Sequence, residues 1–333
     1  MPSNPVAIAV DAMGGDHAPD VVLEGVATAL DADPDLHVLL VGPEAVVSGI
    51  SLERCTPIPA TEVISMGEHP ANAVRAKRDS SIVVGCRLVK EGSAAGFFSA
   101  GSTGACMAAA TLVMGRVAGV DRPAIAAVIP GAERAVVLLD IGANADVKPE
   151  MLVQFALMGR AYAQVVLDVS NPSVGLLNIG EEPTKGSLLA QEAHALMAAS
   201  VPGFVGNVEG RDLPEGSVDV IVTDGFTGNV ALKTMEGLAS VLFSQIKGVL
   251  AESVTSKVGA AMIAPSLKAL RARLDPEAYG GAPLLGVNGA CIIGHGSSSA
   301  QAVSNGIAVT SRAARGNLAE RIKVAIAGSD QPA

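Results

Sequence analysis

Short apolar stretches alternate with helix-length amphipathic patterns along the whole chain of 333 residues. A short apolar run bounded by turn residues is typical of a buried strand, whereas apolar residues spaced three and four apart are typical of a helix. The alternation predicts βαβ units, a largely parallel sheet and a three-layer α/β/α architecture. The strands are predicted at residues 6–10, 36–41, 94–98, 124–129, 135–140, 173–178, 218–222 and 290–293.

Three long helices follow from the same pattern. One is predicted over residues 149–167, because it begins with proline and glutamate, which suit a first turn. Thr227 can cap a second, whose apolar face contains leucines and valines at helical spacing. Ser297 or Ser298 can cap a last helix that runs to about Ala325.

Six of the predicted strands run directly into a polar loop that contains glycine. In open parallel sheets, ligands bind outside the carboxyl ends of the strands. We therefore expect these loops to converge on one edge of one sheet and to form a single anion-binding or catalytic cleft. The loops are Asp11–His17, Ser99–Gly104, Asp140–Asp146, Ile179–Gly186, Asp224–Asn229 and Gly294–Ser299.

Composition narrows the function classes. Nearly half of the residues are hydrophobic, but the chain has no Trp, two Tyr and six Phe, so aliphatic side chains must fill the core. The net charge of −10 argues against nucleic-acid binding. No linker or repeat divides the chain, which predicts one domain over residues 1–328, with two lobes around one cleft as the alternative arrangement.

The cysteines are scattered and no histidine lies at metal-ligand spacing, so neither a disulfide framework nor a metal site is expected. The first residues lack the pattern of a signal peptide, and a cytoplasmic location is expected. Residues 92–115 carry no charge, but glycines and polar residues interrupt them, which favours a buried strand, loop and helix over a membrane span.

One segment departs from the βαβ rhythm. Residues 253–274 hold four basic residues and no acidic one. Pro265 should split the segment into two helices that form a hairpin, with residues 260–263 near its tip. A basic amphipathic hairpin can bind a membrane surface or a partner; the alternative is burial against another subunit.

The loops offer groups that bind anions but no obvious nucleophile. Ser102 and Thr103 supply hydroxyl groups beside glycines, although such turns are common. The usual nucleotide-binding and hydrolase motifs are absent. Lys185 precedes a helix start, where a phosphate would be held, but it could equally pair with a neighbouring glutamate. Asn229 and His17 could donate to a ligand or simply satisfy backbone groups.

Attack of inorganic phosphate on a thioester requires such groups and no protein nucleophile. Phosphate is nucleophilic near neutral pH, and a thiolate is a fair leaving group because a free thiol titrates at about 8.5. The protein must then position phosphate and donate to the developing oxyanion, which Lys185, Asn229 and loop N–H groups could do.

The motifs of the chain closely resemble those of the acyl-ACP:phosphate acyltransferases of bacterial phospholipid synthesis. The resemblance covers residues 6 to about 325, and it departs from the family pattern at Ser102, where Asn is expected. The matching motifs begin at Asp11 (DAMGGDHAP), Val74 (VRAKRDSS), Ser99 (SAGSTGA), Gly119 (GVDRPA), Asp140 (DIGANADVKPE), Gly206 (GNVEGRD), Thr223 (TDGFTGNV), Tyr279 (YGG) and His295 (HGSS).

The resemblance implies reversible conversion of long-chain acyl-ACP and phosphate to acyl phosphate and free ACP, without metal, nucleotide or other cofactor. It also implies a fold similar to the isocitrate/isopropylmalate dehydrogenases and phosphotransacetylases, and a homodimer. The product would pass to a membrane glycerol-3-phosphate acyltransferase, so peripheral membrane association is expected, with Met262 and Ile263 touching lipid. Because the carrier protein is acidic, Arg75, Lys77, Arg78, Arg87 and Lys90 are candidate docking charges.

We expect Lys185 and Asn229, followed by His17, to act directly in catalysis. A decarboxylating dehydrogenase of the same fold and a non-catalytic acyl-carrier or anion-binding module are the alternatives; the loops lack the arginine cluster that the former needs. The residues expected to bind substrate or phosphate are Gly14, Gly15, Asp16, Ser102, Thr103, Gly104, Asn144, Asp224, Thr227, Gly228 and His295.

Overall fold

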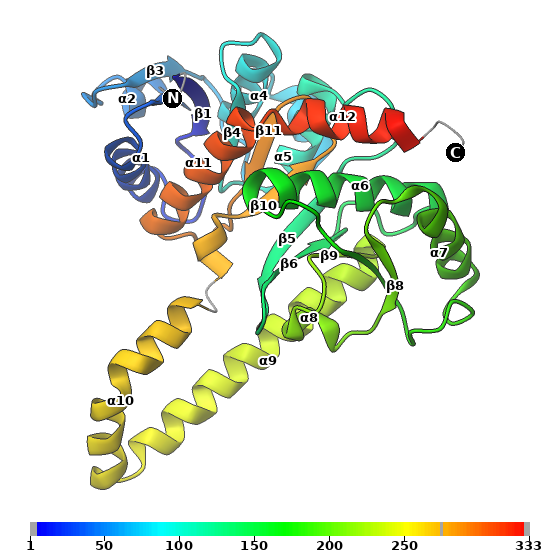
Figure 1. Cartoon of the computed structure of the whole chain (residues 1–333). Coiled ribbons are helices and arrows are strands. Elements are labelled where there is room, and N and C mark those ends of the chain that lie inside the picture. Colours follow the sequence, from blue (N-terminus) through cyan, green and yellow to red (C-terminus); the bar gives the residue numbers. More distant parts are fainter. Residues whose placement is uncertain (1–4, 274–275, 330–333) are drawn as a thin grey trace.

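The computed structural model describes residues 5–273 and 276–329, and within them an 11-stranded sheet is covered by helices (Figure 1). The strand order is β3-β2-β1-β4-β11-β10-β5-β6-β9-β7-β8. The strands are β1 (Val6–Asp11), β2 (Leu36–Gly42), β3 (Cys55–Pro59), β4 (Gly96–Ser99), β5 (Ala124–Pro130), β6 (Ala135–Leu139), β7 (Val174–Leu177), β8 (Phe204–Val208), β9 (Val220–Val222), β10 (Ala282–Leu285) and β11 (Ala290–Ile293).

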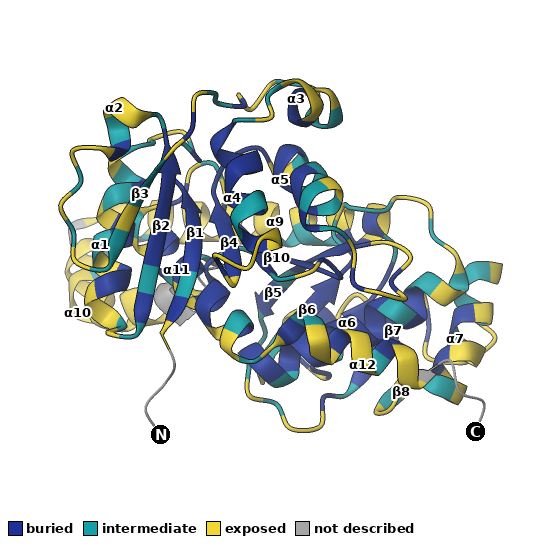
Figure 2. Ribbon diagram, turned by 90° about the horizontal axis from the view of Figure 1, so that it is seen from above, coloured by how far each residue is buried: buried dark blue, intermediate teal, exposed yellow. Residues whose placement is uncertain are grey.

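Helices pack on both faces of this sheet, which confirms the predicted α/β fold class (Figure 2). Strand residues alternate between the two faces, as their period of two requires: Ile8 and Val10 belong to one hydrophobic cluster and Ala9 to another. The first cluster is covered by α1 (Asp20–Ala32), α6 (Pro149–Val166), α7 (Leu188–Ser200), α11 (Ala300–Arg315) and α12 (Leu318–Ser329). The other face is covered by α3 (Pro70–Ala76), α4 (Ser81–Lys90), α5 (Thr103–Ala109) with the π-helix Ala110–Met114, and the start of α9 (Gly225–Ala251).

The two halves of the sheet run in opposite directions, so the expectation that all six loops leave one edge is wrong. Three successive antiparallel pairings, β11 with β10, β10 with β5 and β5 with β6, reverse the strand direction between the halves. The carboxyl ends of β1, β4 and β11 therefore lie at one edge of the sheet, and those of β6, β7 and β9 at the other. The sequence analysis missed β10, whose two antiparallel pairings cancel, so the net reversal comes from the antiparallel β5–β6 pair.

The hairpin also differs from its prediction. Its two arms are α9 and α10 (Val254–Arg273), the chain reverses at residues 252–253, and the pair projects from the body (Figure 1). Pro265 lies inside α10 and does not split it, because a proline inside a helix can kink it without ending it. Met262 and Ile263 consequently lie near the middle of α10, not at a turn between two pieces. Position 274, which the predicted hairpin included, lies outside the described residues.

Two predicted helix starts shift by a few residues. Asp224, not Thr227, is the N-cap of α9, and Ser299, not Ser297 or Ser298, is the N-cap of α11. The predicted last helix is divided into α11 and α12 at Gly316 and Asn317, which has a φ of 51°. The prediction for α6 is confirmed. Among the described helices, none has the length and apolarity needed to cross a membrane.

Candidate functional site

The loops after β1, β4 and β11 meet in a first group at one edge of the sheet. The buried carboxylate of Asp11 ties two of them together: Ser99 Oγ donates to its Oδ2 at 2.7 Å and the N–H of Met13 donates to its Oδ1 at 3.0 Å. Ser99 Oγ in turn accepts from the N–H of Gly101 at 3.0 Å. The third loop joins through the N–H of Asp16, which donates to the Gly296 carbonyl at 2.7 Å.

This group contains many of the residues predicted to bind phosphate. A Cβ at Gly14 would lie 2.8 Å from the backbone nitrogens of Ala100 and Gly101, so only glycine allows the loops to approach this closely. Ser102 is buried and its Oγ caps α5 by accepting from the Ala105 N–H at 3.4 Å. The predicted residues in this group are Gly14, Gly15, Asp16, His17, Ser102, Thr103, Gly104 and His295.

The two histidines of the first group are exposed. His295 Nδ1 lies 2.8 Å from Ser297 Oγ and accepts from the Ser297 N–H at 3.3 Å, so its proton belongs on Nε2. The His17 ring makes no hydrogen bond within the part of the chain that is described. Both rings are therefore available to a ligand at this edge.

A second group forms at the opposite edge around the buried carboxylate of Asp140. Its Oδ1 accepts from the N–H groups of Ile125, Gly142 and Ala143 at 3.1 to 3.2 Å. Its Oδ2 accepts from the backbone N–H of Asn144 at 2.7 Å and from Asn144 Nδ2 at 2.9 Å. Asn144 Nδ2 also donates to the Pro123 carbonyl at 2.8 Å, so its amide holds the loop in this geometry.

Burial acts on both central carboxyl groups in the same way. It raises the pKa of Asp11 above its usual range, against the opposing effect of hydrogen bonds from Ser81, Ser99 and Met13. It also raises the pKa of Asp140, again against hydrogen bonds from the loop it holds. Each of these two carboxyl groups thus mainly holds its loops in place through hydrogen bonds.

The start of α9 packs onto the Asp140 loop. Asp224 accepts from the N–H of Thr227 at 2.8 Å and from its Oγ1 at 2.7 Å, which completes the helix cap. The N–H of Gly225 donates to the Asn144 carbonyl at 2.7 Å, and a Cβ at Gly228 would overlap the Asp140 carbonyl oxygen. Asn229 follows in the first turns of α9; it is exposed, and its side chain makes no hydrogen bond within the described residues.

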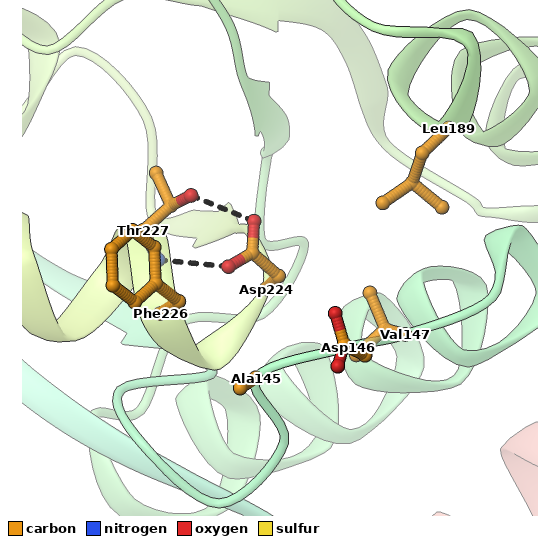
Figure 3. A pocket seen from close by; sticks show the side chains of 7 residues that line it. All are labelled: Ala145, Asp146, Val147, Leu189, Asp224, Phe226 and Thr227. Atoms are coloured by element: carbon orange, nitrogen blue, oxygen red, sulfur yellow. Dashed lines mark hydrogen bonds between the residues drawn. The ribbon is translucent and has the colours of Figure 1, made fainter.

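A groove of about 410 Å³ lies between this helix start, the Asp140 loop and the first turn of α7 (Figure 3). Apolar side chains and two carboxylates line it, with the Asp224–Thr227 pair on one wall. The carboxylates disfavour a bare phosphate inside the groove, whereas the apolar side chains suit a chain or linker. The lining residues are Ala145, Asp146, Val147, Leu189, Asp224, Phe226 and Thr227.

Lys185 belongs to the second group, in the loop between β7 and α7. Its side chain is exposed, and no ion pair or hydrogen bond engages its ammonium group within the described residues. Leu189, four residues later, lines the groove. An unpaired cation at this position can receive an anion.

The predicted site is therefore divided. Lys185, Asn229, Asn144, Asp224, Thr227 and Gly228 lie in the second group, whereas His17 lies in the first. The sequence analysis missed Ser99, Asn178 and Asn207 as supports of these loops. Asn178 follows β7 directly and could have been found as a polar residue at a strand end, but Asn207 lies in β8, which was not predicted.

The cysteines do not form a reactive centre. Cys86, Cys106 and Cys291 are buried, and burial raises the pKa of each thiol, that of Cys291 to about 12. Such thiols stay protonated and are poor nucleophiles. Among the described residues, no group of three or more His, Cys, Asp or Glu could hold a metal ion.

Comparisons with known proteins place the chain in a family. The profile of the family described as "Fatty acid synthesis protein" matches residues 6–321. The phosphate acyltransferase of Desulfitobacterium hafniense is 51% identical over 95% of this chain and 96% of its own, and that of Heliobacterium modesticaldum is 49% identical over 98% and 99%.

Solved structures show the same fold at low sequence identity. A phosphotransacetylase from Streptococcus pyogenes is 18% identical and has a TM-score of 0.61, covering 93% of this chain and 94% of its own. A 4-hydroxythreonine-4-phosphate dehydrogenase from Klebsiella pneumoniae is 12% identical and has a TM-score of 0.53, covering 95% of this chain and 100% of its own. The expected relation to both phosphotransacetylases and dehydrogenases is confirmed at the level of fold.

The family match decides between the alternatives that the sequence analysis left open. Neither the dehydrogenase nor the non-catalytic binding module agrees with close relatives that are phosphate acyltransferases over nearly their whole length. The chain belongs to the fatty acid synthesis protein family of phosphate acyltransferases and is an acyltransferase.

Proposed function

We propose that this enzyme forms long-chain acyl phosphate reversibly from acyl-ACP and inorganic phosphate and releases free ACP, as a step of phospholipid synthesis. A phosphate oxygen attacks the thioester carbonyl carbon, the C–S bond breaks, and the carrier thiolate leaves and takes a proton from solvent. The observation that carries the proposal is the unpaired ammonium group of Lys185, four residues before Leu189 of the groove, in a chain of net charge −10.

The second group of loops supplies what this reaction needs. Lys185 would hold the phosphate and offset the negative charge that develops on the carbonyl oxygen. Asn229 would donate its amide N–H to the same oxygen, because it is exposed near the groove and unengaged. The apolar side chains of Val147, Leu189 and Phe226 favour the acyl end of the substrate in the groove. His17, in the first group, would contact a more distant part of the substrate.

Mass spectrometry of the protein with palmitoyl-ACP and inorganic phosphate tests the proposal. We expect acyl phosphate and free ACP to appear only when phosphate is present, and Lys185→Ala to reduce the rate at least 100-fold. Lys323→Ala is the matched control, because this exposed lysine on α12 makes only a surface ion pair with Glu320. Intact palmitoyl-ACP in the wild-type reaction would refute the proposed substrate and reaction.

The carrier protein would dock beside the first group of loops. A Cβ at Gly104 would lie 2.5 Å from Pro70 Cγ, so α3, which carries Arg75, lies against this group. Arg75 and Arg78 are exposed, whereas Lys77 Nζ is engaged by Glu68 at 2.8 Å and by the Val63 carbonyl at 2.8 Å. The two arginines are therefore the stronger docking candidates, and the remaining ones, Arg87 and Lys90, lie near the end of α4.

Reversing the charge of both arginines tests this docking surface. We expect Arg75→Glu with Arg78→Glu to raise the KM for acyl-ACP about tenfold or more at low salt, because charge complementarity speeds encounter. The effect should shrink as salt screens the charges, and kcat should stay within twofold of wild type. A KM that is unchanged at low salt would exclude this surface.

The same proposal includes the expected assembly and location. We propose a homodimer formed through α9 and a peripheral contact of α10 with the membrane, where an acyltransferase for glycerol-3-phosphate would take the product. The exposed apolar side chains of both helices support it: Leu238, Val241, Leu242, Phe243, Ile246 and Val249 on α9, and Val258, Met262 and Ile263 on α10. The location would thus be cytoplasmic with peripheral membrane association.

A further inference from the structure

The loop that carries Lys185 is closed by one asparagine side chain. Asn178 follows β7, and its Oδ1 accepts from the N–H of Ile179, the first residue of the loop, at 2.9 Å. Its Nδ2 donates to the carbonyl of Lys185 itself at 3.1 Å. A single amide thus fixes both ends of residues 179–185, and the position of the Lys185 backbone depends on it.

The turn within the loop is held from the neighbouring strand. Asn207 lies in β8 and is only 7% exposed, and its Nδ2 donates to the Glu182 carbonyl at 2.9 Å. The N–H of Lys185 donates to the same carbonyl at 3.0 Å, which closes the turn. Lys185 is therefore linked to β7 through its own carbonyl and to β8 through Glu182.

Two glycines leave room for this arrangement. Gly186 has a φ of 86°, and a Cβ there would overlap the side-chain oxygen of Asn178. A Cβ at Gly180 would lie 3.1 Å from Glu182 Oε2 and 3.2 Å from Lys185 Cγ, so the methylene stem of the lysine passes close to this glycine. The bare backbone of Gly180 thus sets where the Lys185 stem can lie, while the ammonium group remains unpaired.

We propose that Asn178, Asn207 and Gly180 are positioning residues that hold Lys185 for the acyl transfer. This inference rests on the proposed function of Lys185. A free lysine side chain has several rotatable bonds, and ordering it costs conformational entropy. Fixing its backbone and stem in the folded protein means that less of this ordering is needed when the substrate binds, which preserves the geometry of the transition state.

Asn178→Asp is the sharpest test, because it keeps the size of the side chain and the acceptor for the Ile179 N–H but removes the donor to the Lys185 carbonyl. We expect kcat to fall about tenfold while the KM for acyl-ACP stays within twofold. Arg211→Ala is the matched control, since Arg211 bonds Glu181 of the same loop at 3.1 Å through an exposed ion pair, and its kcat should remain near wild type. Gly180→Ala is a second variant, which leaves both asparagine bonds in place and should also lower kcat by crowding the lysine stem.

A double-mutant cycle with Lys185→Ala separates positioning from a merely structural role. If Asn178 acts through Lys185, Asn178→Asp should not lower the residual rate further once Lys185 is alanine. The proposal is overturned if Asn178→Asp lowers kcat by the same factor in both backgrounds, or leaves kcat unchanged while Lys185→Ala abolishes activity. If Lys185→Ala has the activity of wild type, the proposed role of Lys185 fails, and the positioning role fails with it.

Discussion

At the residue scale, two buried carboxylates organise the loops at the two edges of the sheet. Asp11 and Asp140 each accept several hydrogen bonds from loop N–H or hydroxyl groups, and within the described residues neither forms an ion pair. Burial without a counter-ion raises the pKa of both groups. Their effect on stability should therefore depend on pH in a defined direction.

For Asp11, proton linkage gives the direction in which the free energy of unfolding changes with pH. A carboxyl group whose pKa is higher in the folded than in the unfolded chain stabilises the fold fully below the unfolded value, and loses this contribution as pH rises through the folded value. Asp11→Asn stays neutral at every pH. The free energy of unfolding of wild type minus that of Asp11→Asn should thus fall as pH rises above about 4 and then level off. Urea unfolding of both proteins across this range measures the difference, and a difference that grows with pH would contradict the assignment.

At the element scale, the junction between α9 and the Asp140 loop leaves no space for a side chain at Gly228. Alanine there would push its Cβ into the Asp140 carbonyl oxygen and separate the helix start from the loop. We expect Gly228→Ala to lower the free energy of unfolding by roughly 1–3 kcal/mol or more, as overpacking does. Gly237→Ala is the control on the same helix, because nothing lies within 4 Å of its Cβ position, and it should stabilise by up to about 1 kcal/mol. Equal unfolding curves for the two variants would show that the contact carries no energy.

The hairpin gives a second prediction at this scale. Met262 is 79% and Ile263 47% exposed on α10, where apolar side chains can enter the interfacial region of a bilayer. We expect Met262→Glu with Ile263→Glu to reduce binding to anionic vesicles at least tenfold in a sedimentation assay, while the rate with soluble acyl-ACP is retained. Vesicle binding that equals that of wild type would exclude α10 as the membrane contact.

The positions of most strands and helices could be predicted from the sequence, because buried strands and amphipathic helices have distinct periods. The pattern located β1, β2, β4, β5, β6, β7, β9 and β11 and the whole of α6. It missed β3, β8 and β10, which are short and contain proline or polar residues. It misread α10 because a proline inside a helix does not always end it, and Pro265 lies within the continuous helix. The loop sequences indicated the loops that meet in the two groups, but Asn207 had no signal apart from the fold.

At the scale of the whole molecule, local patterns cannot determine strand direction across a sheet. The loops were correctly identified, yet the antiparallel β5–β6 pair places them in two groups at opposite edges, because the two antiparallel pairings of β10 cancel. A reaction that joins one large substrate to a small anion can exploit such a division: one group would contact the carrier protein and the other the phosphate and thioester. In this arrangement the docking charges should act mainly on the KM for acyl-ACP, and Lys185 should act mainly on kcat.

The proposed homodimer depends on an exposed apolar face of α9. Helix α9 exposes apolar side chains at the three- and four-residue spacing of one face, including Leu238, Leu242 and Ile246, and such a stripe marks an interaction surface. We expect light scattering to give twice the chain mass of 33.3 kDa for wild type and the mass of one chain for Leu242→Glu, because a buried unpaired charge opposes association. Val324→Glu, at a 64% exposed position on α12, should remain dimeric. If the Leu242→Glu protein stays dimeric, the interface lies elsewhere, because the glutamate must then be exposed to water in the dimer.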